Sequence, residues 1–565
     1  MPSTQSLPTA GLALVVYSYP WPGSASWPWS GWSTVVYKRP GMAWHNFVIV
    51  GSGPAGVAAA RRLEGQGTCI VDVGEIPDRD FAYTSLRASL AAGDLEALLG
   101  PRWETLANLV TPNRLHAKLR AAGLRHVARG ERFHLHDGSG DVVLEGAGSY
   151  AAGGMSNAWG AQLFRFTEAD LTEATNWPIV AGSLREYYED LEAHIGIAGE
   201  LDDMSEFLGE TAHLLPPAPI VSAAQHLLAH HNARRLAKPG PLRLGRSRLA
   251  VLTRPLRGYS PYGFGETEFF STNHSGIYTA KRTLDELRRN GRIEYCGRQK
   301  LVAYRELAEH VELDVVDCDS GASRTIRTRH LLLGCGTLHT TRLVLLNKND
   351  FGRPLPFVDH PPALIPIFIP RMFGSALPLN SFPVQLVATL TGVSPRSMIS
   401  FYYPGGLLWS DLLPDIPLPM DASLKLLTYL LGGMLVAQIW EASRPSHANR
   451  IQLDPGGALR LDYPDRGCSA DLGRLLRALS PLGAFSLKRL ATMAPPGWGF
   501  HYASSLPMRR NPGLYETHTD GRLWDSKRIR VIDGSVLPSL PAKNHSLTLM
   551  ANAARIADEA RRCGY

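Results

Sequence analysis

Cysteine is scarce in this sequence. Six cysteines are spread over 565 residues, and no two form a CxxC pair or another spacing typical of metal ligands: Cys69, Cys296, Cys318, Cys335, Cys468 and Cys563. The absence of such spacings predicts no metal site. Isolated thiols suit a reducing compartment, so we expect a cytoplasmic protein.

Long apolar runs are missing as well. The longest, residues 424–440, contains Lys425, two adjacent glycines and Gln438. These interruptions disfavour a membrane-spanning helix and indicate a core helix followed by a strand.

Acidic residues are absent from residues 234–258, which contain eight Lys or Arg. Such a stretch can attract nucleic acid or anionic lipid. It has no interleaved aromatic residues and no nucleic-acid motif, so we interpret it as a solvated loop. We therefore expect no nucleic-acid partner and no membrane contact beyond a peripheral one.

Residues 1–45 differ in composition from the rest of the chain. They are rich in Pro, Ser and Trp, and the first basic residue is Lys38, whereas a secretory signal needs basic residues ahead of its apolar segment. Met42 lies just before the first clear strand pattern. We interpret residues 1–45 as an extension without a structural role. The remaining length predicts two large domains, or one domain with a large insertion.

The most informative segment is residues 46–75. A short buried strand leads into Gly51-Ser52-Gly53-x-x-Gly56, a helix follows, and a second buried strand ends near Asp72. The glycines permit a tight turn, close approach of a pyrophosphate and close helix–strand packing, and the helix N-terminus favours the phosphates. Asp72 stands 21 residues after Gly51, where an acid binds a ribose diol. This pattern predicts a dinucleotide site.

Further motifs follow in a defined order. A glycine-rich loop, Gly153-Gly154-x-Ser156-Asn157-x-Trp159, precedes WPI at 177–179 and LxxYYxxxE from Leu184. Later come segments 276–306 and 329–345, VDHP at 358–361, a hairpin pattern at 449–464 and RVIDGSVLPS from Arg530. Together these motifs resemble the glucose–methanol–choline (GMC) oxidoreductase family over roughly residues 46–562.

The resemblance implies a mixed α/β fold (α+β overall). An FAD-binding domain of Rossmann type would be assembled from discontinuous segments, with an antiparallel-sheet substrate domain inserted between them. We expect FAD-domain segments within 46–356, interrupted by cap or substrate segments at about 165–275. Residues 357–500 would form mainly the substrate domain, and 501–565 would return to the FAD domain with the catalytic loops.

The resemblance also places a catalytic histidine. Alcohol oxidation removes a hydroxyl proton and a carbon-bound hydride, and histidine suits the proton transfer because its pKa lies near neutrality. HYASSLPM, from His501 to Met508, is similar to the family's segment with the catalytic base, but Ser504 and Ser505 replace its usual Gly-Thr. A second catalytic position falls in KNHSLTL, where we favour Asn544 over His545 as the partner of the substrate oxygen.

The remaining cofactor assignments rest on the resemblance. Asp533 is expected at the ribityl–phosphate region and Val302 beside the adenine. Some relatives attach flavin covalently through a histidine just before the Trp of the glycine-rich loop; Ala158 stands there, so we predict noncovalent FAD.

The expected activity is that of an FAD-dependent oxidoreductase acting on CH–OH donors. We favour a sugar-like, polyol or secondary-metabolite alcohol as substrate, with oxygen, a quinone or a carrier protein as electron acceptor. Two alternatives stay open: a sterol or terpenoid alcohol oxidase, and a GMC-like flavoprotein with a lyase, cyclisation or binding role.

Overall fold

The computed structural model describes residues 44–77, 119, 124–138, 140–174, 177–264, 276–376, 381–394, 396–405, 412, 416–464 and 472–563. Residues 42–565 form one compact unit. The predicted extension, residues 1–45, lies outside the described residues except for Trp44 and His45.

The first sheet is assembled from distant parts of the chain. Its strand order is β8-β2-β1-β11-β10-β9, and β20 pairs with β11. The strands are β1 (Trp44–Val50), β2 (Thr68–Val71), β8 (Glu294–Cys296), β9 (Gln299–Glu306), β10 (Val311–Asp317), β11 (Ser323–Leu333) and β20 (Ile529–Val531). The pairs among β8, β2, β1, β11 and β20 are parallel. A parallel core buried on both faces explains why β1 and β2 are almost continuous apolar runs.

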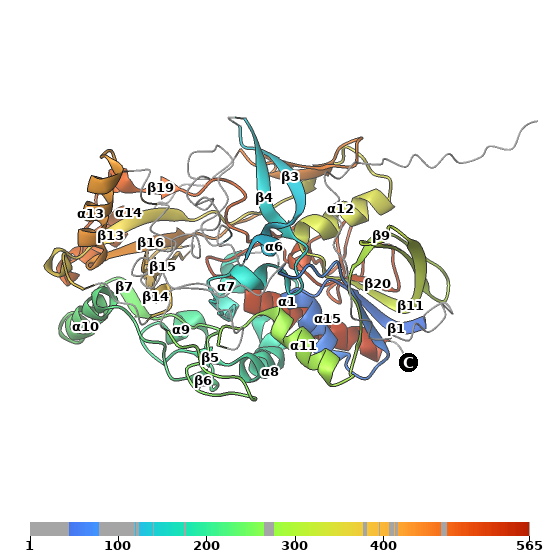
Figure 1. Ribbon diagram of the computed structural model, residues 1–565, viewed down its shortest axis with the longest axis horizontal. Coiled ribbons are helices and arrows are strands. Elements are labelled where there is room, and N and C mark those ends of the chain that lie inside the picture. Colours follow the sequence, from blue (N-terminus) through green and yellow to red (C-terminus); the bar gives the residue numbers. More distant parts are fainter. Residues whose placement is uncertain are drawn as a thin grey trace, which may run out of the picture. The chain divides into compact units, whose positions relative to one another are not determined.

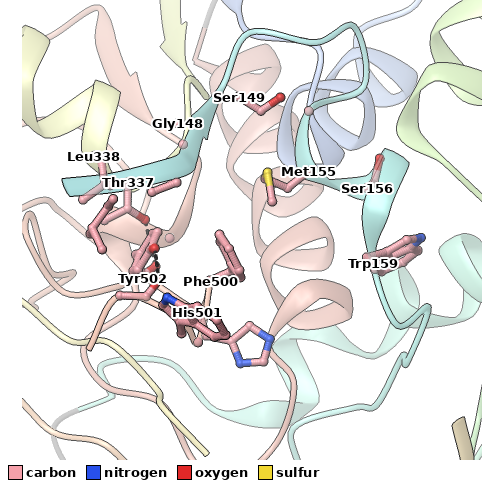
Figure 2. Close-up of a pocket in the computed structure, with 18 of the residues that line it drawn as sticks. Gly148, Ser149, Met155, Ser156, Trp159, Thr337, Leu338, Phe500, His501 and Tyr502 are labelled. Atoms are coloured by element: carbon pink, nitrogen blue, oxygen red, sulfur yellow. Dashed lines mark hydrogen bonds between the residues drawn. The ribbon is translucent and has the colours of Figure 1, made fainter. Parts of the chain in front are cut away.

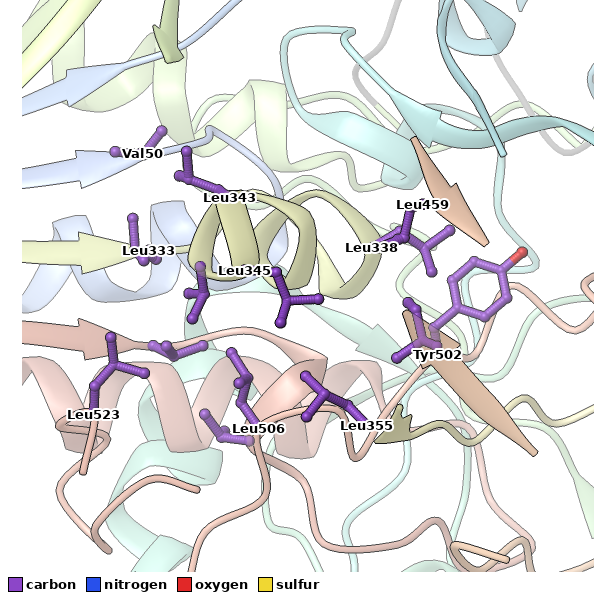
Figure 3. Close-up of a cluster of buried hydrophobic side chains, with 14 of the residues drawn as sticks. Val50, Leu333, Leu338, Leu343, Leu345, Leu355, Leu459, Tyr502, Leu506 and Leu523 are labelled. Carbon is purple, nitrogen blue, oxygen red and sulfur yellow. The ribbon is translucent and has the colours of Figure 1, made fainter. Parts of the chain in front are cut away.

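Helices cover both faces of this sheet. On one face, α1 (Pro54–Arg62) contacts α11 (Ala280–Arg289) and α15 (Ser546–Arg562), and the three helices lie side by side in Figure 1. On the other face, α12 (Thr337–Asn347) joins a cluster of buried side chains that includes Val50, Leu333 and Leu506 (Figure 3). Tyr502 belongs to the same cluster, so the segment around His501 is anchored to the core of the first sheet.

The second sheet is antiparallel and has six strands, as the sequence predicts for the substrate domain. Its order is β19-β13-β16-β15-β14-β7. The strands are β7 (Leu242–Arg246), β13 (Ala363–Phe368), β14 (Val384–Leu390), β15 (Met398–Tyr402), β16 (Met434–Trp440) and β19 (Thr492–Met493). Side chains of α10 (Ser222–Ala237) and α14 (Leu472–Leu479) share a buried cluster with these strands. The helix and strand predicted within 424–440 are α13 (Met420–Leu431) and β16.

A third sheet links the two halves of the chain. Its order is β12-β17-β18-β3-β4, from β3 (Gly130–His136), β4 (Asp141–Ser149), β12 (Leu355–Pro356), β17 (Arg450–Leu453) and β18 (Leu459–Asp462). The hairpin predicted at 449–464 therefore forms, but β18 pairs in parallel with β3, outside the six-stranded sheet.

The smaller elements connect these sheets. They are α6 (Arg125–Ala128), η4 (Gly154–Ala158), α7 (Glu168–Ala174), η5 (Ala181–Leu184), α8 (Arg185–Ile195), β5 (Ile197–Ala198), α9 (Ser205–Leu208), β6 (Leu214–Leu215), η6 (Pro370–Met372), η9 (Ser480–Leu482), η10 (Lys488–Leu490) and η11 (Gly534–Val536). None of the helices in the described part of the chain has both the length and the hydropathy needed to cross a bilayer.

Candidate active site

Three glycines with different roles lie at the junction of β1 and α1: Gly51 and Gly53 in the turn and Gly56 in the first turn of α1. Gly51 has φ +97°, and a Cβ there would lie 2.5 Å from the oxygen of Gly334. A Cβ on Gly56 would lie 1.9 Å from the oxygen of Gly51, so both glycines are required by the packing of the protein itself. A Cβ on Gly53 would meet no atom within 4 Å. Gly53 thus keeps space open at the N-terminus of α1, which has no side-chain cap and therefore has free N–H groups for an anion.

Asp72 lies at the end of β2 and faces the same space. Its carboxylate accepts hydrogen bonds from the Ser52 hydroxyl and, at 3.2 Å, from the Tyr295 hydroxyl. Burial raises the pKa of Asp72 to about 6. Ser52 in turn accepts the N–H of Gly153 at 3.0 Å, which joins the β1–α1 turn to the second glycine-rich loop.

The loop at 153–159 closes against the first turn. A Cβ on Gly154 would be 3.4 Å from the Cα of Gly53. Ser156 accepts the N–H of Ala280 at 2.8 Å and donates to the oxygen of Gly153 at 2.6 Å. The Asn157 amide donates to two carbonyl oxygens of its own loop. The side chains of Ser156 and Asn157 therefore maintain the shape of this loop.

These segments border one cavity of about 1530 Å³. Of the predicted cofactor residues, it is lined by Gly51, Ser52, Gly53, Asp72, Gly154, Ser156, Val302 and Asp533. Gly56, Gly153 and Asn157 do not line the cavity; they pack against or hydrogen-bond the segments that do. The structure therefore brings together the cofactor positions predicted from segments that are far apart in the chain.

Asp533 is engaged within the protein. Its carboxylate accepts the N–H and hydroxyl of Ser535, the N–H of Gly336 at 3.0 Å and the hydroxyl of Thr340. Burial raises its pKa. These bonds tie the turn after β20 to the start of α12 at the cavity wall, so Asp533 shapes the wall on which a ligand would lie.

His501 lies on the cavity wall beside Phe500, facing the side from which Met155 and Trp159 project (Figure 2). Its ring stacks on Trp440 with centroids 4.8 Å apart. The Asn544 amide nitrogen is 3.3 Å from His501 Nε2, and the ring of His545 stands edge-on to that of His501 at 4.9 Å. The three predicted catalytic residues thus meet at one place.

The hydrogen bonds around His501 define its tautomer. His360 Nε2 is 2.5 Å from the carbonyl oxygen of Glu441, which only accepts, so this nitrogen carries a proton. Burial lowers the pKa of His360 to about 3, so the ring is neutral and its Nδ1 is an acceptor. His501 Nδ1 lies 3.4 Å from His360 Nδ1 and must be the donor of that contact. When the His501 ring is uncharged, this arrangement puts its lone pair on Nε2, 3.3 Å from the Asn544 amide nitrogen.

The buried side chains next to His501 leave polar atoms unmatched. Neither Asn544 Oδ1 nor His545 Nδ1 has a hydrogen-bond partner, although both atoms are buried. Burial lowers the pKa of His545 to about 4, so this ring is neutral. Unmatched polar atoms at a cavity wall are suited to a ligand with a polar group. Whether Asn544 or His545 binds the substrate oxygen stays a prediction, with Asn544 favoured.

The VDHP segment positions the loop that presents His501. Val358 and Ala503 exchange backbone hydrogen bonds of 3.0 and 2.9 Å. Asp359 is fully buried and accepts the N–H of Gly497 at 2.6 Å, and burial raises its pKa to about 7. A Cβ on Gly499 would lie 2.4 Å from the oxygen of His360, so the loop passes too close for any other residue.

The two serines that depart from the family pattern have structural roles. Ser504 has φ +70°, a conformation that favours the glycine usual at this position, and its hydroxyl donates to the oxygen of Leu537 at 2.8 Å. The Ser505 hydroxyl accepts a bond of 2.6 Å from Thr341. Both hydroxyls are buried and engaged away from His501, so the departure does not alter the acid–base groups.

His360 and Trp440 contact His501, and the sequence does not predict either contact. His360 stands out in the sequence only as part of VDHP, and its contact with His501 joins positions 141 residues apart. Trp440 ends a strand, where an aromatic residue is ordinarily part of a core. The sequence shows only that the VDHP and HYASSLPM motifs follow in the family's order, and this order does not indicate that His360 and His501 are in contact.

The fold also brings together potential metal ligands. In the described part of the chain, ligand atoms of His45, Cys69 and Glu294 lie within 4.8 Å of one another, and Cys69 Sγ is 3.3 Å from Cys296 Sγ. A hydrogen bond with Cys69 is the largest influence that lowers the pKa of Cys296, and the nearby Arg324 contributes. A guanidinium here disfavours a further cation. The absence of a metal site stays a prediction.

Comparisons with known proteins connect this geometry to a family. Residues 493–553, which include His501, Asn544 and His545, match the family model described as GMC oxidoreductase. Solved structures resemble nearly the whole chain. Pyridoxine 4-oxidase from Mesorbium loti has a TM-score of 0.56 and 14% identity, with 92% of this chain and 99% of that chain covered.

Formate oxidase has a similar likeness. A variant of the Aspergillus oryzae RIB40 enzyme, studied for FAD modification, has a TM-score of 0.59 and 14% identity, covering 92% of this chain and 98% of its own. No curated protein sequence matches. This chain has the GMC oxidoreductase fold. The resemblance inferred from its motifs is confirmed, and so is the mixed α/β class. GMC oxidoreductases bind FAD.

Proposed function

We propose that this protein is an FAD-dependent oxidoreductase that oxidises the CH–OH group of an alcohol with a large apolar body to a carbonyl. The observation that carries this proposal is the position of His501, which lines the same cavity as the glycine-rich turns and an apolar compartment, with its Nε2 3.3 Å from the Asn544 amide nitrogen. A proton acceptor at this junction suits an alcohol whose hydroxyl faces the cofactor.

The residues present fit FAD. The open side of Gly53, the uncapped N-terminus of α1 and the Asp72 carboxylate offer places for a pyrophosphate and a ribose. Ala158 is fully buried and has no nucleophilic atom, which supports noncovalent binding. FAD bound there would supply the acceptor for the carbon-bound hydride.

His501 and Asn544 handle the hydroxyl group. His501 accepts the hydroxyl proton at Nε2 and becomes an imidazolium, whose charge strengthens the hydrogen bond from its Nδ1–H to the neutral His360. Because an Nε2 that accepts the Asn544 N–H has no lone pair left for the hydroxyl proton, the bound alcohol must replace this contact, and we assign the Asn544 N–H to the substrate oxygen instead. Both groups come from rigidly held segments, so the alcohol is oriented before the proton moves.

The apolar compartment favours a substrate class. Beyond His501 the cavity is lined by side chains of β13, β16, α13 and the segment before His501, among them Leu364, Phe368, Leu427, Met434, Val436 and Met493. Gln438 and Thr492 also line the cavity, but selecting a sugar would require more buried hydrogen-bonding groups there, and the remaining side chains match a carbon skeleton. The geometry thus supports the sterol or terpenoid alternative over the sugar-like or polyol substrate that the sequence suggested.

Anaerobic reduction of the bound flavin by a panel of alcohols tests the proposal. The panel pairs cyclic or long-chain apolar alcohols with sugars and polyols of similar size. We expect loss of the oxidised-flavin absorbance with apolar members and none with sugars. Reduction by sugars alone would overturn the substrate class, and flavin that no alcohol reduces would overturn the activity itself.

A further inference from the structure

Large apolar side chains stand exposed where the cavity reaches the surface. We call six of them the collar: Leu418, Leu426, Tyr429, Phe485, Leu487 and Leu490. Tyr429 is 54% exposed and Leu487 is 45% exposed. Figure 1 labels the elements involved, α13 and β13, with β19 following the second collar segment. Leucine and aromatic side chains are seldom left in water in such a group on a soluble protein.

Ring contacts connect the two halves of the collar. Tyr429 of α13 lies 5.9 Å from Phe373, Phe373 lies 6.3 Å from Phe368, and Phe368 lies 5.7 Å from Phe485, all between ring centroids. Phe373 and Phe368, which are not themselves part of the collar, therefore link its Tyr429 side to its Phe485 side.

The collar surrounds an entrance to the cavity. Leu490 is both 38% exposed and part of the cavity lining, and Met493 has the same double role. On the opposite side, Leu427 and Leu430 of α13 line the cavity while Leu426 and Tyr429 face solvent. The apolar surface thus runs without a break from the exterior into the compartment beyond His501.

The two segments that carry the collar differ in charge. Residues 485–490 contain Lys488 and Arg489 and no Asp or Glu, whereas residues 418–429 contain one acid, Asp421, and one base, Lys425. Lys488 and Arg489 follow Leu487 directly and are exposed. Aromatic and leucine side chains with basic neighbours match the interface of an anionic bilayer, where apolar groups enter the acyl boundary and cations meet the headgroups.

We propose that the collar docks this enzyme on the surface of an anionic lipid bilayer, with the cavity entrance facing the membrane. An apolar alcohol dissolved in the bilayer would then reach His501 without crossing water; this last step rests on the proposed function. The surface differs from the basic stretch 234–258 that the sequence drew attention to, because it combines charge with exposed apolar area and a cavity entrance.

Vesicle flotation of the purified full-length holoenzyme tests the docking. We expect binding to phosphatidylcholine vesicles that contain phosphatidylglycerol, weaker binding to phosphatidylcholine alone, and loss of the difference at high salt. Each basic residue near an anionic surface contributes about fivefold in affinity, so Lys488→Glu with Arg489→Glu should weaken binding at least about twentyfold.

A second variant tests the apolar part of the surface. Leu426→Glu with Leu487→Glu should abolish flotation even at low salt, because two charges would have to enter the acyl boundary. Leu514→Glu is the matched control, since Leu514 is also exposed, at 56%, but lies outside the collar. Unchanged flavin content and thermal unfolding would show that the variants fold.

Three results would overturn the docking proposal. They are no binding to either vesicle, binding that the collar variants leave unchanged, and a wild-type oligomer that Leu487→Glu converts to a monomer without any vesicle binding. The last result would identify the collar as a contact between copies of this chain. Flotation does not depend on turnover, so absent docking with intact alcohol oxidation leaves the proposed function standing. If the protein binds vesicles but no alcohol reduces its flavin, the docking proposal stands and only the proposed function is overturned.

Discussion

Gly53 offers a direct test of the cofactor site, because the protein itself does not need this glycine. A Cβ at Gly53 would meet no atom within 4 Å, and the residue has φ −63°, which any L-residue can adopt. Gly53→Ala should therefore change the stability of the cofactor-free protein by less than about 1 kcal/mol. A slightly poorer helix cap opposes a smaller entropy loss on folding, and the two effects nearly cancel.

The cost should fall on the cofactor instead. The added methyl group occupies the space at the N-terminus of α1 where we place the pyrophosphate. Forcing an extra methyl into a filled contact costs about 1–3 kcal/mol, which corresponds to roughly fivefold to 150-fold weaker binding. Gly53→Val adds two further methyl carbons and should prevent purification with bound flavin.

The assay measures flavin per protein in the purified variants and titrates FAD into the cofactor-free forms, with thermal unfolding recorded alongside. Gly182→Ala is the matched control, since a Cβ at Gly182 also meets no atom within 4 Å. Gly53→Val with wild-type FAD affinity would refute the placement of the cofactor. A Gly53→Ala protein that unfolds would refute the claim that the glycine serves only the ligand.

Three further predictions concern the surroundings of His501. His360→Leu should slow flavin reduction about tenfold to hundredfold and alter its pH profile with little change in KM, because it removes a hydrogen bond that strengthens as His501 takes the proton. His360→Gln should restore much of the rate. Equal rates of flavin reduction in the two variants would contradict this role of His360. Ser504→Ala should lower the free energy of unfolding by about 1 kcal/mol in urea titrations, while Ser504→Gly changes it little, since glycine exchanges the lost hydrogen bond for relief at φ +70°. Burial lowers the pKa values of His360 and His545 to about 3 and about 4, from an ordinary 6.5, so the unfolded chain binds protons first and stability is lost as the pH falls below 6.5. Each of the two histidines should lower the free energy of unfolding by about 2 kcal/mol between pH 7 and pH 5. Urea titrations at both pH values should show a smaller loss in His545→Gln than in the wild type.

Local sequence patterns predicted the parts of the site that local structure creates. The β1–α1 turn depends on glycines within a few residues of each other, and the open side of Gly53 follows from that turn. The loop with His501 and the helix start with Asn544 were found through motif resemblance, which also predicted that they meet. The helix and strand expected within 424–440 form as α13 and β16, the latter in the antiparallel sheet.

Contacts between distant segments were not predictable in this way. The bond between His360 and His501 depends on how the 358–360 segment pairs with Ala503, and neither motif contains that register. The parallel pairing of β18 with β3 joins segments with no shared pattern. The apolar substrate compartment depends on which faces of β13, β16 and α13 point inward, so the sequence favoured a polar substrate.

The most direct test of the central claim is the rate of anaerobic flavin reduction in His501→Ala, measured with the best alcohol found for the wild type. The account predicts a decrease of about two orders of magnitude or more at unchanged flavin content, because the hydroxyl proton loses its acceptor. A variant that reduces its flavin as fast as the wild type would contradict the assignment of His501 as the base.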